Sequence, residues 1–171
     1  MLNGDDWLPP MIELSDLVGD WNRFIDAVYA RYLNDLANKK VSFKGRPVVL
    51  RVHPLERGKG SGFWHCIQEG AIESQRVPDM ERCRRIGWIR AIIENWQDAS
   101  IEYWQETRDN KIDHLFWWRE EYLVILSERG SNSAGGPDVY LLKTAYLITQ
   151  PHSKRKKRKA RDDWKSQRRP E

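Results

Sequence analysis

The chain has 171 residues, of which 40% are hydrophobic, so it is long enough for one domain with a sizeable core. No uninterrupted apolar run approaches the roughly 18 residues that a membrane span needs. The acidic N-terminus also lacks the order of a secretory signal. These features predict a soluble, cytoplasmic protein with no membrane partner. The two cysteines, Cys66 and Cys83, are too few for a disulfide framework.

Positive charge is concentrated at the C-terminus. Residues 151–171 contain ten Lys and Arg against three acidic residues, a net charge of +7. The other 150 residues contain 19 basic and 22 acidic residues, a net charge of −3. Since so polar a segment cannot bury apolar area, we expect it to be disordered or loosely helical by itself, a flexible basic tail at 151–171 after one domain at 1–150. The tail either keeps the protein in solution or holds a polyanion such as RNA, with Lys156 and Arg158 as candidate contacts.

Two segments have the apolar spacing of amphipathic helices. After a candidate N-cap at Ser15, apolar residues recur at three- and four-residue steps over 17–36, which predicts a helix ending near Asn38. A second helix is predicted after Asp79, with apolar residues of 86–96 on one face.

The segment between the two helices changes its pattern. Residues 41–43 and 47–52 flank a Lys-Gly-Arg turn and predict a hairpin. The glycine-containing stretch 54–62 predicts a mobile loop, and 63–67 predict an extended segment.

From residue 100 onward the sequence is rich in aromatic and β-branched residues separated by turns. This pattern predicts strands at 101–107, 112–119, 122–128 and 139–148. The fold class is therefore α+β. An N-terminal helix and a second helix would pack on a mainly antiparallel four-stranded sheet.

Phosphate-loop, dinucleotide-binding and zinc-protease motifs are absent from the sequence, and the four histidines lack metal-ligand spacing. We therefore expect no cofactor and no metal. Three groups of residues remain as candidates for chemistry. They are His65 after the glycine-containing loop, the arginine-dense stretch of Arg76, Arg82, Arg84, Arg85 and Arg90, and Lys143, Thr144 and Tyr146 in one predicted strand.

Each group has a catalytic and a structural interpretation. Arg82 and Arg85 are three residues apart on the predicted helix and could grip one phosphate, or pair with surface acids instead. Strand alternation places Thr144 and Tyr146 on one face and Lys143 on the other. Together, a histidine, a cation and a hydroxyl suit RNA cleavage without a metal. That reaction needs a base for the 2′-hydroxyl, a cation for the phosphorane and an acid for the leaving oxygen.

Several short motifs occur in a familiar order. They are FxGxPV (43–48), FWH (63–65), DxxRCxRIxWIRxxIE (79–94), VIL (124–126) and LLxTAY (141–146). From about residue 20 to residue 150 the chain resembles phage- and toxin-associated members of the barnase/EndoU/colicin/RelE-like nucleases. The resemblance implies a small α+β ribonuclease that works without a metal.

The same resemblance implies roles for individual residues. His65 would be the general base or acid, one of Arg82, Arg84 and Arg85 would hold the phosphate, and Thr144 and Tyr146 would line the scissile site. Arg85 is the first choice among the arginines, and Lys143 is a further substrate-binding candidate.

The leading hypothesis is an endoribonuclease toxin of a toxin–antitoxin or phage-conflict system, which cuts RNA to a 2′,3′-cyclic phosphate. An acidic antitoxin or immunity protein would be its partner. One alternative is a non-catalytic RNA- or DNA-binding regulatory protein that uses the basic tail. Another is a structural phage component that binds only proteins.

Overall fold

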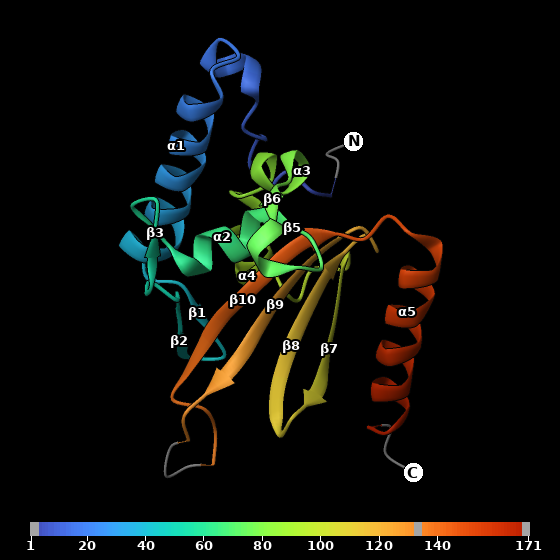
Figure 1. Ribbon diagram of the computed structural model, residues 1–171. Coiled ribbons are helices and arrows are strands. Elements are labelled where there is room, and N and C mark those ends of the chain that lie inside the picture. Colours follow the sequence, from blue (N-terminus) through green and yellow to red (C-terminus); the bar gives the residue numbers. More distant parts are fainter. Residues whose placement is uncertain (1–3, 132–134, 169–171) are drawn as a thin grey trace.

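The computed structural model describes residues 4–131 and 135–168. The centre of the α+β fold is a six-stranded sheet with the order β1-β2-β10-β9-β8-β7 (Figure 1). The four longest strands form an antiparallel meander, as the sequence predicts. They are β7 (Ile101–Arg108), β8 (Lys111–Trp118), β9 (Tyr122–Arg129) and β10 (Val139–Leu147).

The sheet is larger and mixed, so the expectation of a four-stranded antiparallel sheet was wrong. Strands β1 (Ser42–Phe43) and β2 (Arg46–Val49) form the expected hairpin. Strand β2 also pairs in parallel with β10, at Tyr140 and Leu141. Without β2, the edge of β10 opposite β9 would present unpaired backbone groups. The hairpin satisfies some of these groups. The pairing stops after Leu141, and farther along β10 packs against helix α2 (Ser61–Ile67) instead.

Four α-helices contribute to the larger core. They are α1 (Trp21–Tyr32), α2, α3 (Met80–Arg84) and α4 (Trp88–Glu94), and α1 continues as the π-helical turn η2 (Leu33–Asn38). Phe24, Ile67 and Ile89 of this layer belong to the same cluster of buried side chains as Phe116 of the sheet. Minor elements complete this side: η1 (Leu14–Leu17), η3 (Glu73–Gln75), and the hairpins β3–β4 (Leu55–Glu56, Lys59–Gly60) and β5–β6 (Gln68–Glu69, Val77–Pro78).

Two local predictions in this region were also wrong. Residues 63–67 are helical rather than extended, because Phe63, Trp64, Cys66 and Ile67 are all buried on one side of α2. This spacing fits a short helix as well as an apolar strand. The second predicted helix begins after Asp79 as expected, but it is not continuous: it is interrupted after Arg84 and resumes at Trp88 as α4.

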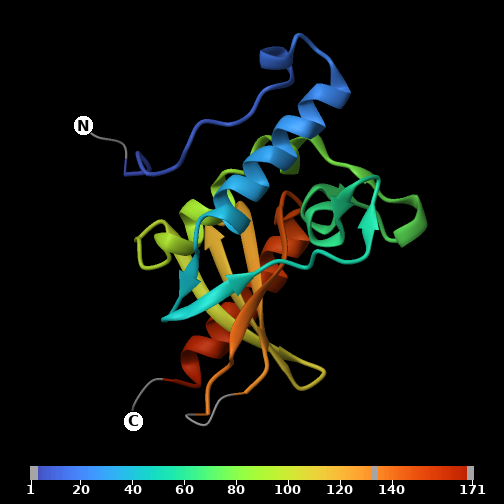
Figure 2. The same ribbon diagram turned by 90° about the vertical axis from the view of Figure 1, so that its left-hand side faces the viewer.

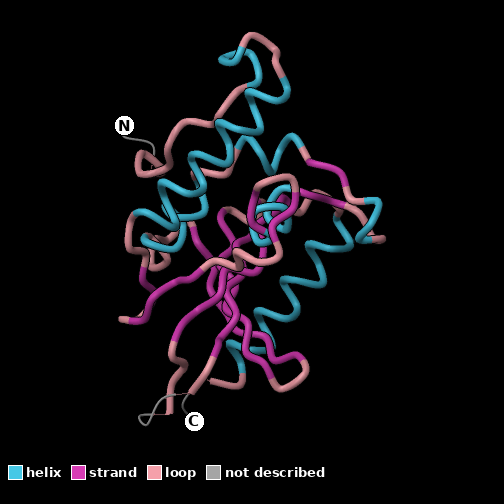
Figure 3. Tube along the Cα trace, turned by 60° about the vertical axis from the view of Figure 1, so that its left-hand side comes forward, coloured by secondary structure: helices cyan, strands magenta, loops and turns pink. Residues whose placement is uncertain are grey.

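Residues 151–166 do not form a disordered tail. They form helix α5 (Pro151–Ser166), which lies beside β7 (Figure 1). The strands lie between α5 and α1 (Figure 3). Trp164 joins a second apolar cluster of Trp104, Leu115, Trp117, Leu123, Ile125 and Ile148.

Ion pairs also hold α5 on the sheet. Lys157 pairs with Glu106, Arg158 with Glu120, and Lys165 with Glu102. Acidic residues in the body of the protein therefore neutralise part of the positive charge of α5. The composition of residues 151–171 alone could not show this. Among the described residues, no helix is both long and apolar enough to cross a bilayer.

Candidate functional site

A pocket of about 380 Å³ opens where β2 and β10 part, and we call it the central pocket. Helix α2, hairpin β5–β6 and helix α3 supply the side opposite β10. The charged lining residues are five basic side chains and one acidic one: Arg51, Arg76, Arg82, Arg129, Lys143 and Glu69. His65, Thr144 and Tyr146 also line the central pocket, so the structure brings together the histidine, the hydroxyls and three of the cations predicted from sequence.

His65 faces the central pocket from α2 as a neutral base. Partial burial lowers the pKa of its imidazole below the ordinary value, and the positive charges of Arg76 and Arg51 lower it further. Nη1 of Arg76 lies 3.5 Å from Nδ1 of His65. Because a guanidinium can only donate, this contact leaves the ring proton on Nε2 and the lone pair on Nδ1.

Thr144 and Lys143 reach the central pocket together because β10 contains a bulge. The register with β9 shifts between Leu142 and Thr144, which inserts Lys143 as the extra residue. The prediction that Lys143 and Thr144 lie on opposite faces was therefore wrong. The Lys143 ammonium pairs with the carboxylate of Asp113 at 2.7 Å. The Thr144 hydroxyl donates to the carbonyl of His65 at 3.1 Å, so Thr144 positions the histidine.

Arg82 and Tyr146 form the side of the central pocket nearest α5. Nη1 of Arg82 donates to the carbonyl of Gln68 at 2.6 Å, and its guanidinium lies 5.1 Å from the centre of the Tyr146 ring. These contacts hold the guanidinium in a fixed orientation. Burial raises the pKa of the Tyr146 phenol, which keeps its proton on the oxygen.

Arg76 belongs to the arginine-dense stretch singled out from the sequence, whereas Arg51 and Arg129 of the central pocket were missed by sequence reasoning. Arg51 follows β2, and Arg129 ends β9. They are far apart in the sequence, and only the pairing of β2 and β9 with β10 brings Arg51 and Arg129 to one site. The only signal in the sequence was a basic residue near the end of a predicted strand. Basic residues are too common in such positions to identify these arginines.

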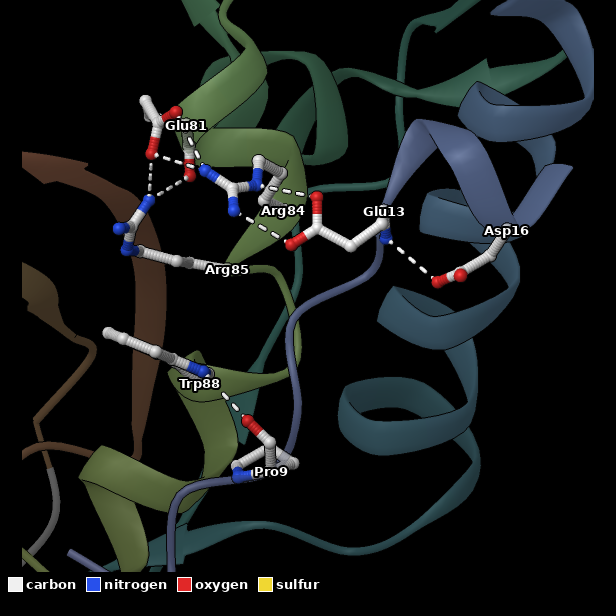
Figure 4. Close-up of polar contacts among 7 residues, drawn as sticks. All are labelled: Pro9, Glu13, Asp16, Glu81, Arg84, Arg85 and Trp88. Atoms are coloured by element: carbon white, nitrogen blue, oxygen red, sulfur yellow. Dashed lines mark hydrogen bonds and ion pairs between the residues drawn. The ribbon is translucent and has the colours of Figure 1, made fainter. Parts of the chain in front are cut away.

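Arg84 and Arg85 do not line the central pocket. Arg84 lies between Glu13 and Glu81 and donates to both carboxylates, while Arg85 turns to Glu81 as well (Figure 4). The ion pair of Arg84 with Glu13 holds the N-terminal segment, which doubles back beside α1 (Figure 2), whereas the ion pairs with Glu81 are local to α3. Trp88 fixes the same segment by donating to the carbonyl of Pro9 at 2.9 Å. These arginines therefore have a structural role.

Two further pockets adjoin the central one. An outer pocket shares Arg51, His65 and Arg76 with it, and an α5 pocket shares Arg82 and Tyr146. The side chain of Lys156 lines the α5 pocket, whereas Arg158 lines none of the three and pairs with Glu120 at 2.6 Å. The central pocket is thus the middle of a longer basic depression.

Within residues 4–131 and 135–168, no group of three or more His, Cys, Asp and Glu side chains could hold a metal ion. No family model, no curated protein and no solved structure matches the chain.

The arrangement combines anion binding with proton transfer. Fixed guanidinium groups can bind a phosphate by paired hydrogen bonds and stabilise additional negative charge on it. A neutral imidazole can accept a proton near neutral pH, and a protonated phenol can donate a hydrogen bond or a proton. A pocket of this size accommodates a group as large as a nucleotide.

Proposed function

We propose that the protein is an endoribonuclease whose active site is the central pocket and whose chemistry uses no metal. The observation that carries this proposal is the position of His65, with its unprotonated Nδ1 next to the guanidinium of Arg76. In RNA the 2′-hydroxyl adjoins the phosphate that it attacks. A base beside a phosphate ligand therefore suits this reaction.

In the proposed reaction, Arg76 turns from Nδ1 of His65 to the scissile phosphate. The freed lone pair of Nδ1 then accepts the proton of the 2′-hydroxyl while the 2′-oxygen attacks phosphorus. Arg76 and Arg82 stabilise the charge of the phosphorane. The bond between phosphorus and the 5′-oxygen then breaks, and Tyr146 supplies the proton that the leaving oxygen takes up. The products are a 2′,3′-cyclic phosphate and a 5′-hydroxyl. Proton return from His65 to Tyr146 through solvent restores the starting state.

Thr144 acts in this proposal as a positioning residue. Its hydroxyl binds the backbone of His65 and does not face substrate as a free group. Lys143 adds positive charge at the edge of the central pocket, although Asp113 neutralises part of it. We also propose the biological setting that the sequence resemblance implies, a toxin acting on cytoplasmic RNA and inhibited by an acidic partner.

The test incubates labelled RNA with purified protein in the presence of EDTA and identifies the product ends. His65→Asn should lower the cleavage rate by about 10²- to 10⁴-fold, the usual size of a lost acid or base. Arg82→Gln should also lower it, whereas Arg85→Gln, a matched change on the neighbouring turn, should leave it close to the wild type. Circular dichroism checks that each variant is folded.

Intact RNA after incubation with folded wild-type protein would refute the proposal. A non-catalytic RNA- or DNA-binding protein is the second candidate, favoured by the five basic side chains in one pocket. In that case Arg82→Gln would weaken nucleic-acid binding and His65→Asn would have no effect.

A further inference from the structure

The α5 pocket is the most distinctive feature of the surface outside the central pocket. Its volume is about 560 Å³, and it lies between the first turns of α5 and the ends of β7 and β10. Glu69, Arg82 and Tyr146 line both pockets, so the two are continuous. A ligand in the central pocket could extend directly into the α5 pocket.

The net free charge of the α5 pocket is positive, although Glu69 contributes one exposed carboxylate that forms no ion pair with the described residues. Lys157 faces it but pairs with Glu106, whose carboxylate also accepts a hydrogen bond from Trp104 at 3.1 Å. Arg108 at the end of β7 and Lys156 on α5 are exposed, and neither forms an ion pair with any residue that the structure describes. Two unneutralised cations therefore face one pocket from two different elements.

Lys156 is held in place by the attachment of α5 to the sheet. The ion pair of Lys157 with Glu106 comes from the next residue along the helix, at 3.1 Å. Farther along, Arg161 donates to Glu120 at 3.0 Å and Trp164 packs on Tyr103. These contacts make α5 a wall of the pocket, so Lys156 presents its charge at a defined place and not from a flexible chain.

We propose that the α5 pocket binds the neighbouring phosphate of single-stranded RNA when one nucleotide occupies the central pocket. Arg108 and Lys156 would contact that second phosphate, and Arg82 would lie between the two. Pockets of about 380 and 560 Å³ each suit one nucleotide-sized group, so a duplex would have to open before entering. This inference rests on the proposed function for the identity of the ligand as RNA.

The test measures binding separately from cleavage. Isothermal titration calorimetry would compare a 2′-O-methyl RNA dinucleotide, which has a single phosphate, with a 2′-O-methyl hexanucleotide. Neither can be cleaved, because the attacking hydroxyl is blocked. The double variant Arg108→Gln/Lys156→Gln would be compared with the wild type and with Arg155→Gln, a control on an exposed position of α5 outside all three pockets.

The double variant should bind the hexanucleotide about 10- to 100-fold more weakly, as expected for lost hydrogen bonds to a charged group. Its affinity for the dinucleotide should stay unchanged. The slope of log affinity against log salt should fall by about 0.7 for the lost phosphate contact. Arg155→Gln should resemble the wild type in all three measurements.

Equal weakening of both oligonucleotides, or the same loss in Arg155→Gln, would overturn the inference, as would failure of the wild type to bind either one. If unmodified RNA is not cut but the hexanucleotide binds as expected, the proposed nuclease fails and the second phosphate site stands. If RNA is cut and the double variant binds the hexanucleotide normally, the nuclease stands and the second site fails.

Discussion

Replacing Glu120 with glutamine should loosen the attachment of α5 to the sheet without changing the central pocket. Glu120 lies in the turn between β8 and β9, and its carboxylate accepts hydrogen bonds from Arg158 at 2.7 Å and from Arg161 at 3.0 Å. Glutamine has nearly the same shape but no charge. The variant therefore removes two ion pairs and little packing.

The exposure of the three side chains limits how much the unfolding free energy can fall in Glu120→Gln. Arg161 is 13% exposed, Glu120 31% and Arg158 42%, so the pairs are partly screened by solvent. The pair of Glu120 with Arg161 is the less exposed of the two, and a surface ion pair of this kind contributes about 0.2–1 kcal/mol. Arg161 retains Asp162 and Glu102 as partners, which favours the lower part of this range. In a protein of this size a loss in this range corresponds to a fall in Tm of about 1–4 °C.

Thermal unfolding followed by circular dichroism at low and high salt measures this effect. Glu121→Gln is the control, because Glu121 is exposed and has no ion pair with the described residues. The Tm difference between the two variants should shrink as salt screens the charges. Equal Tm values for both variants at low salt, or a difference that salt does not change, would refute the electrostatic attachment of α5.

The same variant has an expected pH dependence. Hydrogen bonds from Arg158, and then from Arg161, lower the pKa of Glu120 below its ordinary value of 4.5. The stabilisation is therefore fully present above pH 4.5 and is lost as the pH falls through the lowered pKa. The wild-type protein and Glu120→Gln should become equally stable at the acidic end of this range.

Three further predictions test the core and the site. In Gly62→Ala, the new Cβ would lie 2.8 Å from the carbonyl oxygen of Arg51, so the unfolding free energy should fall by about 1–3 kcal/mol in a urea titration. Trp164→Ala removes a partly buried ring from the cluster under α5 and should lower stability by about 2 kcal/mol in the same assay. The cleavage rate should rise with pH with a midpoint below pH 6.5, because burial and nearby arginines lower the pKa of His65. Arg76→Gln should move that midpoint upward, since it removes a positive neighbour.

Each of these predictions has a matched control. Gly4→Ala adds a methyl group where no atom lies within 4 Å, and Trp21→Ala removes a ring that is already 39% exposed. Equal stability losses in test and control variants would contradict the packing argument. A cleavage rate whose midpoint does not move in Arg76→Gln would contradict the electrostatic coupling to His65.

Sequence reasoning located the strands of the meander because their pattern is local. Alternating aromatic and β-branched residues bounded by turns identify 101–148 as strands, whatever lies beside them. The same reasoning failed at 63–67, where an apolar run of five residues suits a strand or a helix. It also missed the pairing of β2 with β10, because backbone pairing between distant segments leaves no local pattern.

Sequence reasoning likewise predicted some residues of the candidate site and not others. His65, Thr144 and Tyr146 were predicted from residue type and context, and the structure places all three in one pocket. Arg85, the first choice among the arginines, lies outside the central pocket, whereas Arg82 lines it. The position of an arginine on a predicted helix does not show whether an acidic partner lies close to it. Glu13, 71 residues from Arg84, is such a partner.

The sequence by itself determined the α+β class, the helical and extended segments with strong periodicity, and the excess of basic residues after residue 150. Tertiary structure decided where those charges go. Glu102, Glu106 and Glu120 lie close enough to α5 to bind its basic side chains, which converts a predicted flexible tail into a helix packed on the sheet. The physical reason is that charge pairing and edge pairing depend on distances between segments far apart in the chain, and only folding sets those distances.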